Sequence, residues 1–287
     1  MGAYFGPAGN SESFAAMGYK NSLDVPEYVQ KMGLDAYEYQ CGRGVNIGQD
    51  KARQLGAAAA QKGIALSVHA PYYISLASKE EAKRDNSIRY IYESAAAVHA
   101  MGGDRIVVHP GGLGGLSREQ ATELAGETLR RALDYLDSEG LSMIRVCPET
   151  MGKINQLGNL EEVLTLCTLD ERLIPCIDFG HLNARTHGGL RTTEDFGRVF
   201  DAVRDRLGES RLKEYHAHFS KIAYTDGGEK MHLTFEDDTF GPDYEPVMEW
   251  TLRYDCSPVI ICESAGTQAE DAAAMKQYYH SLMEQNQ

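Results

Sequence analysis

The chain has 287 residues, of which 43% are hydrophobic, a size that allows one large core or two smaller ones. Its formal net charge of -14 is a poor basis for binding DNA or RNA, because phosphate contacts supply most non-specific affinity, but it suits a site for cations. No apolar run approaches the roughly 20 residues of a membrane span, the first residues lack a targeting signal, and the six cysteines form no CxxC pair. We therefore expect a soluble, cytoplasmic protein with reduced cysteines, no membrane partner and no obligate protein partner.

Short apolar runs alternate with helical segments along the whole chain. The runs predict strands over residues 3–6, 36–41, 64–69, 105–109, 143–149, 173–178, 214–219 and 258–263. Helices are predicted over 24–32, 49–62, 117–139, 159–167, 193–207 and 269–283, with one more that ends near 101 and another around Trp250. Apolar strands that alternate with helices imply a parallel sheet covered by helices. Eight such units predict one domain over residues 1–287, an α/β protein with the (β/α)8 fold of a TIM barrel.

The connection after the seventh strand is longer than the others. Residues 221–240 separate this strand from its helix, and they contain the turn signal TDGG at 225–228 between alternating residues. We expect a β-hairpin there, on the C-terminal face of the barrel. Loops of this length in compact domains are usually functional.

Six successive strands end in side chains of the kinds that bind metals. Active sites of (β/α)8 barrels lie at the C-terminal ends of the strands. The residues at or just after this position are His69, His109, Glu149, Asp178, His181, His218 and Glu263. Any single one could be an ordinary core residue, but chance does not explain six coincidences on one rim. Three converging carboxylates would repel one another unless cations lay between them, so the sequence predicts a metal cluster.

The number of predicted ligands is too large for one ion. Four groups close a tetrahedral site, and three leave a position for water or substrate. A shared carboxylate such as Glu149 would bridge two ions about 3.5–4 Å apart, a spacing that suits in-line displacement at phosphorus. The mixture of His and carboxylate favours Zn²⁺, with Mn²⁺ and Fe²⁺ as alternatives.

Several segments together resemble one family of enzymes. They are FGPAG (5–9), SVHAPY (67–72), VHPG (108–111), ET (149–150), CIDFGH (176–181) and ES (263–264). The family is endonuclease IV, the TIM-barrel apurinic/apyrimidinic endonucleases within the xylose-isomerase-like superfamily. The resemblance implies hydrolysis of the phosphodiester 5′ to abasic sites in duplex DNA, in base-excision repair. It also implies Glu149 and Glu263 as the catalytic carboxylates.

The same resemblance implies three zinc sites. Their ligands would be His69, His109 and Glu149 for the first, Glu149, Asp178, His218 and Glu263 for the second, and His181 and His232 for the third. At the third site the sequence departs from the family, because Lys230 stands where the family has Asp. The sequence therefore predicts two zinc ions. For the third it leaves three alternatives: Glu229 substitutes through a shifted hairpin, the ion is weakly bound, or it is absent.

Three residues outside the ligand set have expected roles. Tyr72 matches the tyrosine that the family inserts into DNA, and Arg43 lies on the second loop, where the family also contacts DNA. The duplex would be kinked and the abasic nucleotide flipped into the site. His216 lies on the same side of its strand as His218 and is expected to support that ligand.

Two alternatives to a nuclease remain open. A sugar isomerase or epimerase of the xylose-isomerase-like superfamily would need one divalent metal and two carboxylates for proton transfer. The -14 charge suits a neutral sugar, but such a site has no need of His69, His109 and His181. A non-catalytic metal-binding barrel is supported only by Lys230.

Overall fold

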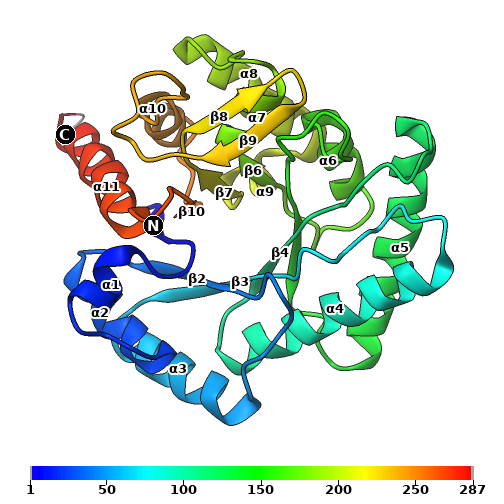
Figure 1. The fold of residues 1–287 in the computed structure, drawn as a ribbon, viewed down its shortest axis with the longest axis horizontal. Helices are drawn as coiled ribbons and strands as arrows, with labels where there is room; N and C mark the ends of the chain where they lie inside the picture. The colour runs from blue at the N-terminus through cyan, green and yellow to red at the C-terminus, as the bar shows by residue number, and fades with distance from the viewer. Residues whose placement is uncertain (1, 286–287) are drawn as a thin grey trace.

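The structure is a computed structural model that describes residues 2–285 (Figure 1). Within these residues, eight strands form the barrel wall: β1 (Tyr4–Pro7), β2 (Ala36–Gln40), β3 (Ala65–His69), β4 (Arg105–Val108), β5 (Arg145–Pro148), β6 (Cys176–Asp178), β7 (His216–Phe219) and β10 (Val259–Cys262). They form two parallel sheets, β1-β10-β7-β6 and β2-β3-β4-β5. Single bridges, Ala8 with Glu38 and Glu149 with Cys176, join the sheets at both edges, so the wall closes. The predicted (β/α)8 fold is confirmed.

Helices surround the wall (Figure 1). One helix packs outside the wall after each strand, in order: α2 (Val25–Lys31), α3 (Gln49–Gln61), α4 (Glu81–Ala100), α5 (Arg118–Ser138), α6 (Leu160–Cys167), α8 (Thr193–Leu207), α10 (Glu245–Arg253) and α11 (Gln268–Gln285). Capping boxes begin α5 at Ser117, α6 at Asn159 and α8 at Thr192, where side chains accept from backbone N–H groups that have no partner inside the helix. No helix in residues 2–285 combines the length and apolar character that crossing a membrane requires.

Four short helices lie where the sequence predicts loops or turns: α1 (Glu12–Ala16), the 3-10 helix η1 (Ser22–Asp24), α7 (Phe179–Arg185) and α9 (Glu209–Lys213). The most consequential is α7, which begins directly after β6. The Asp178 side chain caps it by accepting from the His181 backbone N–H at 2.7 Å. The helices predicted from the sequence include none over residues 179–192, so the prediction missed α7, and the spacing of Asp178 and His181 is fixed by the first turn of a helix.

The predicted hairpin is present as β8 (Ile222–Thr225) and β9 (Gly228–His232). Its tip is bonded to the loop after β5, because Ile154 N–H donates to Gly227 O and Glu229 N–H donates to Gly152 O, both at 3.1 Å. The hairpin is therefore held over the C-terminal face of the barrel rather than projecting into solvent.

The main core lies between the wall and the helices and contains Phe5, Leu55, Ile106 and Val146, all fully buried. A separate cluster of Val107, Cys147, Ile174 and Cys176 uses the opposite faces of β4 and β5, and so fills the barrel interior. All six cysteines are buried and unpaired, as the sequence predicts.

Candidate metal centre

The structure brings all eight predicted metal ligands together at the C-terminal ends of the strands. Among the described residues, five groups have ligand atoms that lie within 4.8 Å of one another, and three of them contain all eight predicted ligands: His69, His109 and Glu149; Glu149, Asp178, His218 and Glu263; and His181, His232 and Glu263. The first two groups are the two sets expected from the sequence. The third has Glu263 beside the two expected histidines.

Glu149 lies at the middle of this arrangement and is fully buried. Its Oε2 is 3.3 Å from His69 Nε2 and 3.0 Å from His109 Nε2. Its Oε1 is 3.3 Å from His218 Nδ1 and 3.2 Å from His181 Nδ1. Each carboxylate oxygen therefore faces two imidazoles, which is the geometry of a carboxylate shared between two cations.

The electrostatics of the centre fit a bound cation. Burial would raise the pKa of Glu149, but His109 and His218 hold it well below its usual range. Burial raises the pKa of Asp178 to about 6. Asp178 Oδ2 is buried and accepts no hydrogen bond from the described residues, and the imidazole of His181 lies beside it with Nδ1 3.1 Å away. A buried carboxylate oxygen that accepts no hydrogen bond is costly unless positive charge lies against it, so these residues fit a metal ion.

A β-bulge decides which hairpin residue reaches His181. Across β8 and β9, Ile222 pairs with His232 and Tyr224 pairs with Glu229, and the extra residue of the bulge is Lys230. Because alternate residues of β8 share a face, Glu229 and His232 also share one, and Lys230 is exposed. The hairpin is therefore shifted by one residue, which turns Glu229 rather than Lys230 toward the face of His232.

Glu229 lies against His181 because a glycine makes room for it. Glu229 Oε2 is 3.5 Å from His181 Nε2. A Cβ at Gly152 would lie 2.6 Å from Glu229 Cβ and 2.9 Å from His181 Cδ2, so a larger residue would push the two side chains away. His232 is oriented by Ser220, whose Oγ is 2.8 Å from His232 Nδ1.

The centre opens into a cavity of about 310 Å³. The cavity is lined by His69, Tyr72, His109, Met151, Lys153, Gln156, His181, Glu229, His232 and Glu263. Glu149, Asp178 and His218 are not among the lining residues and are fully buried. Tyr72 is 57% exposed, and its ring centroid lies 5.3 Å from that of His109. Arg43 is exposed on the loop after β2 and does not line the cavity.

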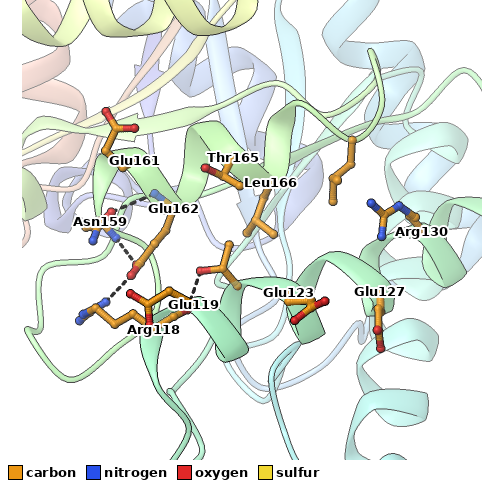
Figure 2. A pocket seen from close by; sticks show the side chains of 12 residues that line it. Arg118, Glu119, Glu123, Glu127, Arg130, Asn159, Glu161, Glu162, Thr165 and Leu166 are labelled. Carbon is orange, nitrogen blue, oxygen red and sulfur yellow. Dashed lines mark hydrogen bonds and ion pairs between the residues drawn. The ribbon is translucent and has the colours of Figure 1, made fainter.

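A larger cavity, of about 600 Å³, lies between α5 and α6 and contains none of the predicted site residues (Figure 2). Figure 2 shows Arg118 paired with Glu162 there, at 2.6 Å. Arg118 also donates to the carbonyls of Ile154 and Gln156, and Arg185 donates to the carbonyls of Met151 and Lys153. These two arginines hold the loop that forms one wall of the metal cavity.

Glu38 of β2 is a residue of the site that the sequence reasoning missed. It is fully buried and lies 3.0 Å from both His216 and His218. A signal was present, because a carboxylate in the middle of an otherwise uncharged strand requires a partner, and His216 precedes the expected ligand His218 by two residues.

The fold and the site define a (β/α)8 barrel with clustered metal-binding residues at the C-terminal ends of its strands. The chain belongs to the xylose isomerase-like TIM barrel family, whose sequence pattern matches residues 26–280.

Three further comparisons show which known proteins the chain is similar to. An uncharacterized protein of Methanocaldococcus jannaschii is 33% identical over 259 residues, 90% of this chain and 92% of that one. A probable endonuclease 4 of Acholeplasma laidlawii is 28% identical over 179 residues, 60% of this chain and 59% of that one. A solved D-tagatose 3-epimerase-like protein superimposes with a TM-score of 0.73 over 99% of both chains at 18% identity, which shows the shared fold.

Proposed function

We propose that this protein is a metal-dependent phosphodiester hydrolase of the endonuclease IV kind, which incises duplex DNA 5′ to abasic sites. The position of Glu149 between two pairs of imidazoles is the observation that carries the proposal. A one-metal site is complete with Glu149, Asp178, His218 and Glu263. A one-metal site does not account for the position of His69 and His109, whose Nε2 atoms lie 3.3 and 3.0 Å from Glu149 Oε2. Similarity to a probable endonuclease 4 supports the same choice.

Zinc is the metal that we propose, held by the first two groups with Glu149 shared between them. Bound zinc would lower the pKa of a water to about 7 and stabilise charge on the oxygens around phosphorus. Among the protein groups, Glu263 borders the cavity with 15% of its side chain exposed, whereas Glu149 is fully enclosed. Glu263 is therefore the carboxylate placed to accept a proton from the attacking water, and Glu149 holds the imidazoles in position.

A third ion would be held by His181, His232 and Glu229. The carboxylate of Glu229, 3.5 Å from His181, takes the place that Lys230 cannot fill, because an ammonium group is not a ligand at neutral pH. Glu263 lies within ligand distance of the same histidines and would link this site to the second.

Two features of the cavity favour a nucleic-acid substrate over a free sugar. Tyr72 presents an exposed aromatic ring at the edge of the cavity, a shape suited to stacking on bases next to a flipped-out nucleotide. Lys153 lines the cavity and, with bound metals, would turn a locally acidic site into an attractive one for phosphate despite the net charge of -14. Arg43, on the loop after β2, is a further proposed DNA contact.

The test is to measure the metal content of the purified protein together with cleavage of a duplex oligonucleotide that carries one abasic site. We expect three zinc ions per chain, of which the third is the one beside His181 and Glu229, and a single incision on the 5′ side of the lesion. An undamaged duplex of the same sequence is the control and should remain intact. One Mn²⁺ per chain with no incision would overturn the proposal.

The second candidate is a one-metal sugar isomerase or epimerase. It is favoured by the completeness of the four-ligand group around Glu149 and by the acidity of the chain. In that enzyme two carboxylates would exchange a proton next to a carbonyl. Interconversion of ketoses by the Mn²⁺-loaded protein, with no incision of DNA, would favour it.

A further inference from the structure

Glu38 forms a buried polar network inside the barrel, beneath the metal centre. Its Oε2 accepts from Ser67 Oγ at 2.9 Å and lies 3.0 Å from His216 Nε2. Its Oε1 lies 3.0 Å from His218 Nε2 and accepts from Gln40 Nε2 at 3.3 Å. Glu38, His216 and His218 have no exposed surface.

The fold alone gives no reason for this network. A buried carboxylate is costly to desolvate, and a buried charged network can often be replaced by apolar side chains of similar volume with little loss of stability. Ser67, Gln40 and two imidazoles instead surround the two Glu38 oxygens within 3.3 Å, a setting that suits a carboxylate. A role for the Glu38 carboxylate is therefore expected in its contact with the predicted ligand His218.

The two ring nitrogens of His218 face different surroundings. Nδ1 points into the metal centre, 3.3 Å from Glu149 and 3.5 Å from Glu263. Nε2 points away from the centre, toward Glu38. The contact with Glu38 has the distance of an ion pair but not the angle of a hydrogen bond, so it acts through charge. A negative charge beside Nε2 favours the proton on that nitrogen and leaves the Nδ1 lone pair for a cation.

We infer that Glu38 is a positioning residue for the metal centre, which holds His218 with Nδ1 turned toward the metal, while His216 and Ser67 hold Glu38. The inference rests on the metal centre of the proposed function and not on its substrate. Carboxylates that orient a ligating histidine typically contribute 10–100-fold to metal affinity.

The experiment compares zinc affinity, by competition with a chromophoric chelator, in the full-length wild type, Glu38→Gln and Thr251→Val. Glu38→Gln keeps the shape and removes the charge. Thr251→Val is the matched control, since its fully buried hydroxyl bonds with Tyr215 at 2.8 Å, in the outer layer. We expect a loss of about 10–100-fold for Glu38→Gln and no change for Thr251→Val. The visible spectrum of the Co²⁺-loaded protein should change only in Glu38→Gln.

Equal zinc affinity in the wild type and a folded Glu38→Gln would overturn the inference. If that variant does not fold, Ser67→Ala decides, because it removes one hydrogen bond to Glu38 and leaves the charge. A loss of about 2–12-fold, the equivalent of one hydrogen bond of about 0.5–1.5 kcal/mol, supports the inference, and an unchanged affinity overturns it. A wild-type protein that binds no zinc would instead remove the proposed function itself.

Discussion

Glu229 Oε2 lies 3.5 Å from His181 Nε2, although a regular hairpin would turn this carboxylate away from the imidazole. The bulge at Lys230 changes the face on which residue 229 lies. The loop after β5 keeps the bulge in place, since its Gly152 carbonyl accepts from the Glu229 N–H. Because of this one extra residue, Glu229 rather than Lys230 lies at the wall of the cavity.

This relationship predicts different outcomes for two adjacent substitutions. Glu229→Gln should reduce the zinc content from three ions per chain to two, because it removes the charged member of the third site. Lys230→Ala is the control and should leave three, since Lys230 is exposed on the other side of the bulge. The measurement is metal analysis after dialysis against a weak chelator. Three ions retained in Glu229→Gln, or an ion lost in Lys230→Ala, would contradict the assignment.

His109→Ala separates the two candidate functions. In the nuclease it removes a ligand of the first ion, and with it several kcal/mol of transition-state stabilisation, so incision should fall on the order of 100-fold or more. One zinc should be lost and the fold should be kept. In a one-metal isomerase the four-ligand group is untouched, and sugar turnover should change little. A His109→Ala variant with full incision would rule out the first metal site.

The main features of the fold and of the ligand set could be predicted because all parallel strands of a barrel end on the same face. Residues at the ends of successive strands therefore lie near one another. His69 and Glu263 are far apart in sequence, yet both follow the ends of parallel strands and so face the same cavity. The remaining features depend on contacts that no local pattern encodes. The partner of Glu38, His216, lies 178 positions away on β7. The bulge at Lys230 is bonded to Gly152, which is far away in sequence, and the capping of α7 by Asp178 appears only in the structure.

Metal binding should weaken in acid. Asp178 has a pKa of about 6, raised by burial, and its carboxylate must be deprotonated to ligate. Above pH 6 it is mostly charged, and its protonation no longer limits binding. As the pH falls through 6 the proton competes with the metal, and zinc affinity should fall by about tenfold per pH unit for this group alone.

The same competition requires that protons leave when zinc binds. Burial would lower the pKa of His181, but Asp178 and Glu149 hold it well above its usual range, so without metal this imidazole is protonated at neutral pH. Titration calorimetry in two buffers of different ionisation enthalpy, at pH 7.5 and 5.5, measures the protons released and the change in affinity. An affinity that is the same at both pH values would contradict the role of Asp178 as a ligand.

Removal of the metal should destabilise the fold. Three carboxylates, of Glu149, Asp178 and Glu263, lie close together in this site. Without a bound cation they repel one another, and only the nearby imidazoles offset their charge. Zinc that binds only the folded chain stabilises it by about 4 kcal/mol at a free concentration 1,000 times Kd. Chelation should therefore lower Tm on the order of 10 °C, as measured by thermal unfolding with and without a strong chelator. Return of Tm on adding zinc back, but not calcium, is the control for an effect of the chelator itself.

Tyr72 and Tyr73 form a matched pair for testing the DNA-binding role of the loop after β3. Both are exposed, by 57% and 59%, but only Tyr72 lines the cavity, while the ring of Tyr73 packs beside Tyr90. A stacked aromatic ring contributes about 1–3 kcal/mol of nucleic-acid binding. Tyr72→Ala should therefore raise the Kd for an abasic duplex by about 5–150-fold, with unchanged zinc content, whereas Tyr73→Ala should have little effect. Equal losses in both variants would mean that the loop binds DNA without a specific role for Tyr72, and no loss in either would place the DNA elsewhere.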